Sequence, residues 1–231
     1  MSEASESGPT DAGTLYWERR LSDVKDALDA NNFEAYVSGS AASARQLVVD
    51  EILPTLDVRT FSRSGSMTES AVGLLALMRE DPRYEFIEPF GEAEISLEER
   101  YEVAKRSIAV DLYVTGSNAI TERGQLVNLD MFGNRITGIN YGPRNTIVLA
   151  GRNKVAPDLE TAMRRVRQVV APQLGVSFAA HDPGAARPCG KTSRCSDCSA
   201  PDRICNVWSI VEKCYPKGRI KVILINEDLG L

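Results

Sequence analysis

The stretch VRTFSRSGSMTESAVGLLALMREDPRYEFI, residues 58–87, predicts a strand, a helix and a second strand in succession. Residues 58–61 and 84–87 at its two ends are short runs of apolar and aromatic side chains, which is typical of strands. The segment 66–80 between them has the spacing of a helix. A strand, helix and strand of this length predict two parallel strands joined by a crossover helix.

The same alternation continues on both sides of this unit. Further strands are expected at 34–37 and 111–114, and further helices at 40–53 and 96–109. Apolar residues from Leu15 to Phe33 recur at helical spacing, so a first helix is expected to end near residue 31. The pattern predicts the α/β class, with a mainly parallel sheet covered by helices on both faces in a three-layer sandwich.

The pattern changes after about residue 119. Three apolar runs at 124–129, 134–139 and 145–150 are separated only by turn residues, so neighbouring strands without helices are expected there. A helix at 157–170, a loop at 175–203, a short helix at 206–214 and a last strand at 219–225 complete the prediction.

Composition narrows the class of protein. The chain has 231 residues, a length at which one domain is expected. Its formal net charge is −5, so no nucleic-acid partner is expected. Residues 1–13 carry no hydrophobic core for a signal peptide and are expected to be disordered, with a single domain at 14–231. Without eighteen consecutive apolar residues, no membrane partner is expected and the location is predicted to be cytoplasmic. The oligomeric state stays open.

The loop Phe61-Ser-Arg-Ser-Gly-Ser-Met-Thr68 lies where a predicted strand ends and a helix begins. Gly65 can adopt a conformation closed to other residues, while Ser66 can cap the helix and leave backbone amides free. Helix N-termini attract phosphate and carboxylate groups, so this loop is a candidate site for a small anionic ligand. The plain alternative is an ordinary helix cap.

Other polar residues follow predicted strands. Asn118 and Glu122 in the loop 115–124 could face one pocket, with Glu122 as a nucleophile or general base, although a lone Glu beside Gly is also typical of an exposed turn. Asp130, Asn134 and Lys154 add polar groups at strand ends, and their alternative role is hydrogen bonding within turns.

Four of the five cysteines, Cys189, Cys195, Cys198 and Cys205, lie within a cysteine-rich loop at 182–205. The two-residue gap between Cys195 and Cys198 lets one turn direct two sulfurs at the same point, which suits Zn²⁺ or an iron–sulfur cluster. Reduced surface thiols and a redox pair are the alternatives. His181 is the only histidine, so a two-histidine metal site is excluded.

Several motifs together resemble the LUD domain of the lactate-utilisation protein family. They are Ser64-Gly-Ser-Met-Thr68, the run from Thr115 to Asp130, Gly133-Asn-Arg135, Tyr141-Gly-Pro143, Ala150-Gly-Arg-Asn-Lys154 and Ile225-Asn-Glu-Asp-Leu-Gly230. The resemblance implies the NagB/RpiA/CoA-transferase-like fold. It also implies a role in oxidising L-lactate to pyruvate alongside iron–sulfur partner proteins.

The resemblance extends to single residues. Gly65, Ser66 and Thr68 correspond to the loop that holds anionic groups in that fold, and Glu122 resembles the nucleophile in the Glu-x-Gly motif of CoA transferases. With the polar residues at strand ends, the predicted ligand-binding set is Ser64, Gly65, Ser66, Thr68, Gly116, Asn118, Asp130, Asn134 and Lys154.

Three functional hypotheses follow. The first is a subunit or accessory factor of lactate oxidation that passes electrons through a [4Fe–4S] cluster, or holds Zn²⁺, on the four cysteines. The second is an enzyme acting on a small phosphorylated, carboxylated or CoA-linked substrate through Glu122. The third is an interaction module whose cysteine-rich loop docks a partner.

Overall fold

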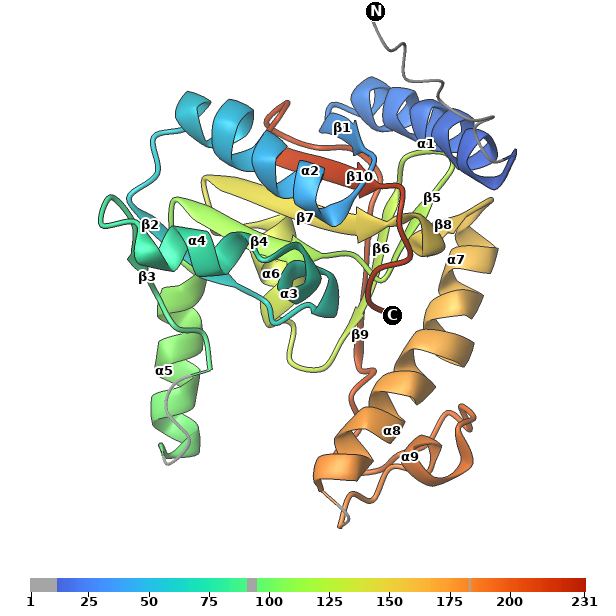
Figure 1. Cartoon of the computed structure of the whole chain (residues 1–231). Coiled ribbons are helices and arrows are strands. Elements are labelled where there is room, and N and C mark those ends of the chain that lie inside the picture. Colours follow the sequence, from blue (N-terminus) through green and yellow to red (C-terminus); the bar gives the residue numbers. More distant parts are fainter. Residues whose placement is uncertain (1–11, 91–94, 183) are drawn as a thin grey trace, which may run out of the picture.

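The computed structural model describes residues 12–90, 95–182 and 184–231. Its centre is a six-stranded sheet in the order β1-β10-β7-β4-β2-β3, and all neighbouring strands pair in parallel (Figure 1). The strands are β1 (Glu34–Ser38), β2 (Thr60–Arg63), β3 (Glu85–Phe86), β4 (Leu112–Gly116), β7 (Asn145–Gly151) and β10 (Ile220–Ile225).

The middle of the sheet consists of strands that are buried along their whole length. Every residue of β4 and β10 is buried, as is every residue of β7 after Asn145. Such continuous apolar runs are typical of parallel strands covered on both faces.

Helices cover both faces of this sheet. On one face lie α2 (Ala41–Leu47), η1 (Val48–Ile52), η2 (Leu53–Thr55), α3 (Met67–Val72) and α4 (Leu74–Glu80), which share an apolar core with β2, β4, β7 and β10. The other face packs against α1 (Ala12–Ala30) and α6 (Asn134–Asn140). The helix α5 (Leu97–Ile108) contacts β2 and α6. This arrangement confirms the predicted three-layer α/β fold.

A smaller sheet extends from the end of the large one, in the order β8-β5-β6-β9. It consists of β5 (Ala119–Thr121), β6 (Leu126–Asp130), β8 (Val155–Ala156), which follows η3 (Arg152–Lys154), and β9 (Val207–Val211). The helix α7 (Leu159–Arg165) packs on this sheet, and η4 (Val166–Val170) and α8 (Ala171–His181) continue it into an arm (Figure 1). The short helix α9 (Cys189–Thr192) and the cysteine-rich loop lie against this arm.

Two predicted elements were wrong. Residues 134–139, predicted as a strand, form α6, because an Asp130 carboxylate oxygen accepts hydrogen bonds from the amides of Gly133 and Arg135 and fixes the start of a helix. Residues 206–214, predicted as a helix, contain β9, whose apolar residues pair along β6.

The boundaries of other segments also differ. The helix predicted to end at residue 170 continues to His181, so the loop predicted from residue 175 begins later. Of the segment predicted to be disordered, 1–13, residues 1–11 lie outside the described residues, and Ala12 and Gly13 begin α1. No helix in the described part of the chain is both long enough and apolar enough to cross a membrane.

Candidate functional site

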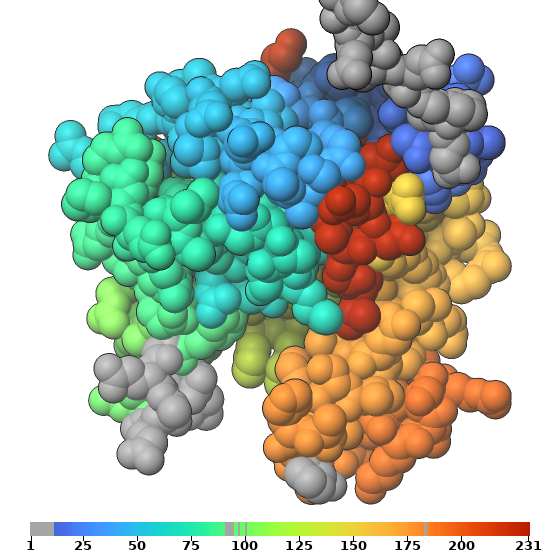
Figure 2. Space-filling model, in the orientation of Figure 1, coloured from blue at the N-terminus to red at the C-terminus, as the bar shows by residue number. Residues whose placement is uncertain are grey.

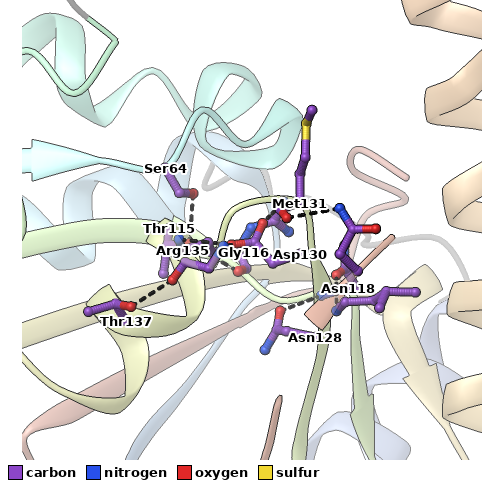
Figure 3. Close-up of polar contacts among 12 residues, drawn as sticks. Ser64, Thr115, Gly116, Asn118, Asn128, Asp130, Met131, Arg135 and Thr137 are labelled. Atoms are coloured by element: carbon purple, nitrogen blue, oxygen red, sulfur yellow. Dashed lines mark hydrogen bonds and ion pairs between the residues drawn. The ribbon is translucent and has the colours of Figure 1, made fainter. Parts of the chain in front are cut away.

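The carboxyl ends of β2 and β4 bring three predicted site residues together. The hydroxyls of Ser64 and Thr115 lie 2.7 Å apart and join the two strand ends (Figure 3). A Cβ placed on Gly116 would lie 2.5 Å from the Ser66 hydroxyl oxygen, so only glycine allows the end of β4 to approach the loop after β2 this closely. Ser64, Ser66 and Gly116 therefore form one edge, and Gly65 between the two serines has the left-handed φ of 75°.

Lys154 and Thr68 meet beside this edge. The Lys154 ammonium donates a hydrogen bond of 2.7 Å to the Thr68 hydroxyl, which donates to the backbone oxygen of Leu229. Burial, together with the nearby charges of Arg165 and Arg135, lowers the pKa of Lys154 to about 7. In the space-filling view the C-terminal residues lie at the surface between the helices of residues 41–80 and the arm (Figure 2).

Asn118 and Asp130 shape the loops around the edge. Asn118 exchanges hydrogen bonds with β6, because its amide donates to the Asn128 side chain and its side-chain oxygen accepts from the Leu129 amide. One Asp130 oxygen accepts from two amides at the start of α6, while the other lies 3.7 Å from an Arg135 nitrogen (Figure 3). Asn134 is the half-buried first residue of α6.

Glu122 does not join these residues. Its side chain is 41% exposed and lies 2.6 Å from the Arg20 guanidinium of α1. The groove that it lines is otherwise formed by α1 residues such as Leu15, Tyr16 and Asp23, and none of the other predicted site residues lines it. The structure therefore separates the predicted nucleophile from the predicted ligand-binding loop.

Four residues without a predicted role occupy the edge instead. Glu69 is 1% exposed, and its carboxylate lies 3.7 Å from the Arg63 guanidinium at the end of β2. Burial raises the pKa of Glu69 to about 7, against the lowering effect of Arg63. Tyr113 is fully buried in β4, and Arg135 lies in the first turn of α6. The only signal in the sequence was that Arg63 and Arg135 occur within motifs that otherwise consist of small polar residues.

The cysteine-rich loop forms a second candidate site. Cys189, Cys195, Cys198 and Cys205 all line one cavity of about 20 Å³, which Ala171 and Pro172 of α8 also line. Gly175 of α8 lets Cys189 approach, since a Cβ there would lie 2.6 Å from the Cys189 sulfur. Burial raises the pKa of the Cys189 thiol, and the three neighbouring cysteines raise it further.

Arg203 holds this loop in shape. Its guanidinium donates to the backbone oxygens of Cys198 and Cys205 and to the Asp197 carboxylate. The fifth cysteine, Cys214, is buried elsewhere in the core under α1. The His181 ring contacts the backbone oxygen of Ser177 in its own helix and does not line the cavity.

The thiols are not arranged around a metal ion as they stand. Within residues 12–90, 95–182 and 184–231, no three His, Cys, Asp or Glu side chains are grouped closely enough to hold one. A metal would therefore require the thiols to deprotonate and rotate toward the centre of the shared cavity.

Comparison with known proteins identifies the family. A family model described as the LUD domain matches residues 21–225. The chain belongs to the LUD domain family. This membership supports a lactate-utilisation-type protein. No curated protein matches.

Two solved structures are similar to this LUD domain protein. A crystal structure of a DUF162 family protein from Deinococcus radiodurans has 11% identity and a TM-score of 0.46, covering 90% of this chain and 98% of its own. A crystal structure of eIF2B beta from Chaetomium thermophilum has 14% identity and a TM-score of 0.26, covering 62% of this chain and 44% of its own.

Proposed function

We propose that this LUD domain protein is a subunit or accessory factor in the oxidation of L-lactate to pyruvate, and that its four clustered cysteines hold a metal centre. Family membership supports the lactate role. The observation that carries the metal centre is that all four cysteines line a single cavity, although they come from α9, the loop after it and the segment before β9.

The surroundings of the cavity suit a site of negative charge. Four thiolates bring more negative charge than one metal ion neutralises, so nearby cations stabilise such a centre. Arg203 lies against the loop, and Arg167 from η4 forms a 2.7 Å ion pair with Asp197, which lines the cavity. These arginines hold the loop without contributing a ligand.

The two candidate occupants imply different roles. Zn²⁺ has no redox chemistry, so it would fix the loop as a docking surface for an iron–sulfur partner protein. A [4Fe–4S] cluster would supply one-electron transfer. A cavity of about 20 Å³ has room for roughly one water-sized body, so its size favours a single ion, and a cluster would require the loop to expand.

Metal analysis of protein purified without oxygen tests the proposal. We expect about one zinc ion per chain, or iron with labile sulfide and a visible absorption band if the cluster is the occupant. Cys198→Ser should lose the metal. Cys214→Ser is the matched control, since the Cys214 thiol donates to the Pro216 backbone oxygen and a serine hydroxyl can do the same.

The outcomes separate the hypotheses. Metal bound equally by both variants would contradict the four-cysteine centre, as would wild-type protein free of zinc, iron and sulfide. A Cys195–Cys198 disulfide that forms reversibly in metal-free protein would favour the redox-pair alternative. A further outcome is that the protein binds metal without changing the rate at which an extract of its host oxidises L-lactate. That result would support the metal centre and contradict the lactate role.

The alternative of an enzyme that uses Glu122 receives less support from the contacts. Glu122 is paired with Arg20 on the surface, and the groove beside it contains no other predicted ligand-binding residue. An anionic ligand is better supported at the edge formed by the ends of β2 and β4.

A further inference from the structure

After β10 the chain crosses the carboxyl edge of the large sheet as a short strap, residues 226–230. At its start, the Asn226 amide donates to the Ser38 backbone oxygen at the end of β1, 2.8 Å away. The Glu227 carboxylate accepts a hydrogen bond of 3.0 Å from the Ala41 amide at the start of α2. The strap thus joins elements that lie far apart in the sequence, and it lies at the surface between the helices α2 to α4 and the arm (Figure 2).

Two consecutive side chains of η3 hold the other end of the strap. Arg152 Nε lies 2.9 Å from a carboxylate oxygen of Asp228. The Asn153 side chain accepts a hydrogen bond of 3.1 Å from the Leu229 amide and donates one of 3.2 Å to the Gly230 backbone oxygen. The turn that follows β7 therefore holds the strap through an ion pair and two hydrogen bonds.

The third side chain of η3, Lys154, is joined to the strap through Thr68. The Lys154 ammonium donates to the Thr68 hydroxyl at 2.7 Å, and this hydroxyl donates to the Leu229 backbone oxygen at 3.0 Å. A Cβ on Gly230 would lie 2.6 Å from the same hydroxyl oxygen, so the strap passes in direct contact with Thr68. Any movement of the strap must therefore change the surroundings of Lys154.

Lys154 is costly to bury. It is 4% exposed, and in the described part of the chain no carboxylate lies within ion-pair distance of its ammonium. The charges of Arg135 and Arg165 oppose its own. By contrast Lys221, which is 5% exposed, lies 3.4 Å from the Glu34 carboxylate. Because an amine buried without a counter-charge is destabilising, packing alone does not account for Lys154.

The attachments of the strap suit local opening. The ion pair between Arg152 and Asp228 is at the surface, with side chains 27% and 67% exposed, and such pairs contribute little to stability. Of the strap residues, Leu229 packs against the apolar core, whereas the others have polar side chains or none. Segments with few buried apolar contacts open without unfolding the whole domain.

We propose that the strap is a lid over Lys154 and Thr68, with Asn226 as its fixed end and Arg152 and Asn153 as its catch. Asn226 is fixed because its amide continues the parallel pairing of β10 with β1. When the catch releases, Thr68 loses its acceptor on Leu229 and the Lys154 amine becomes accessible to solutes. The lid lies apart from the four clustered cysteines, so it does not depend on the metal centre.

Amine acetylation of the full chain tests the lid. Folded protein is treated with sulfosuccinimidyl acetate, and the rate at each lysine is followed by mass spectrometry. Arg152→Gln should raise the rate at Lys154 about fivefold, the effect of losing roughly one exposed ion pair. Asn153→Ala should raise it about tenfold or more, because two hydrogen bonds are lost. Unchanged rates at Lys154 in both variants would overturn the proposal.

Lys221 separates opening of the lid from unfolding of the domain. It is as buried as Lys154 but lies at the other end of β10, so its rate should not change in either variant. An equal increase at both lysines would mean that unfolding exposes Lys154, and the lid would be excluded. Arg164→Gln is the matched substitution, because it removes an exposed ion pair with Glu160 far from the strap, and it should change neither rate.

Hydrogen exchange gives a second measure of the same motion. In Arg152→Gln and Asn153→Ala the Leu229 amide, which donates to the Asn153 side chain, should exchange faster in parallel with acetylation of Lys154. The Asn226 amide should keep its wild-type protection, since it is at the fixed end. Faster exchange at Asn226 to the same extent would show that the end of β10 separates from β1, which contradicts a lid that opens at residues 227–230.

Discussion

The ammonium group of Lys154 lies 2.7 Å from the hydroxyl of Thr68, a residue 86 positions earlier in the sequence. The two residues are 4% and 0% exposed. Thr68 in turn donates to the Leu229 backbone oxygen, so the lysine is held by neutral groups at the edge of the sheet. This burial lowers the pKa of Lys154 to about 7 and makes the charge of the edge depend on pH.

Stability should rise with pH because of Lys154. The folded-state pKa of about 7 lies below the ordinary 10.5, so between these values the unfolded chain binds a proton that the folded chain lacks. The free energy of unfolding should therefore increase across that range by a few kcal/mol, and Lys154→Met should remove the increase. Urea unfolding at about pH 7 and pH 9.5 measures it. If the free energy of unfolding depended on pH equally in wild type and Lys154→Met, Lys154 would not be the cause of the increase.

Glu69 should act in the opposite direction. Its folded-state pKa of about 7 lies above the ordinary 4.5, so between these values the folded chain binds the extra proton. Stability should fall as pH rises through this range, by up to roughly 3 kcal/mol, and Glu69→Gln should flatten the fall. Urea unfolding at about pH 5 and pH 7.5 measures it, with the exposed Glu160→Gln as control. A control that flattened the slope equally would exclude Glu69 as the cause.

The sequence predicted the sheet well because its strands are buried on both faces. The runs that form β4, β7 and β10 are mostly apolar, so residues 111–114, 145–150 and 219–225 could each be recognised locally as a strand. The elements at 134–139 and 206–214 were wrong because distant residues decide them. The turn after β6 starts α6, and pairing with β6 makes β9 a strand.

The candidate site was only partly predictable for a related reason. Small residues such as Ser64 and Gly116 follow strands and could be placed at one edge from topology alone. Arg63, Glu69 and Arg135 look like surface residues in the sequence. Only the folded structure shows that Glu69 is buried and that the side chains of Arg63 and Arg135 are no more than 27% and 19% exposed. Glu122 was linked to the same edge by motif, but α1 supplies its partner Arg20.

Gly138 should be required where α6 packs on Tyr113. A Cβ at this position would lie 2.4 Å from the ring of Tyr113, which is fully buried, so Gly138→Ala should destabilise the protein by about 1–3 kcal/mol. Gly39→Ala is the matched control, because a Cβ at Gly39 would have nothing within 4 Å of it. Chemical denaturation compares the two, and equal stability would show that α6 can shift away from Tyr113.

Arg203 should control the affinity of the cysteine loop for metal. Its three nitrogens contact Cys198, Cys205 and Asp197, which a lysine cannot do at once. Arg203→Lys should weaken metal binding about 10–100-fold, the usual effect of losing a group that orients the ligands. Competition with a chromophoric chelator measures it, with Arg164→Lys as control. Unchanged affinity in Arg203→Lys would mean that the thiols alone fix the loop.

Glu122 should contribute little to either site. Its ion pair with Arg20 is largely exposed, and exposed pairs typically contribute about 0–1 kcal/mol, so Glu122→Gln should change the free energy of unfolding by less than about 1 kcal/mol. Because the groove beside Glu122 contains none of the four clustered cysteines, the metal content of Glu122→Gln should stay at the wild-type value. Metal analysis and chemical denaturation of the Glu122→Gln protein measure these two quantities. Loss of metal, or a loss of stability well above about 1 kcal/mol, would show that Glu122 does more than pair with Arg20.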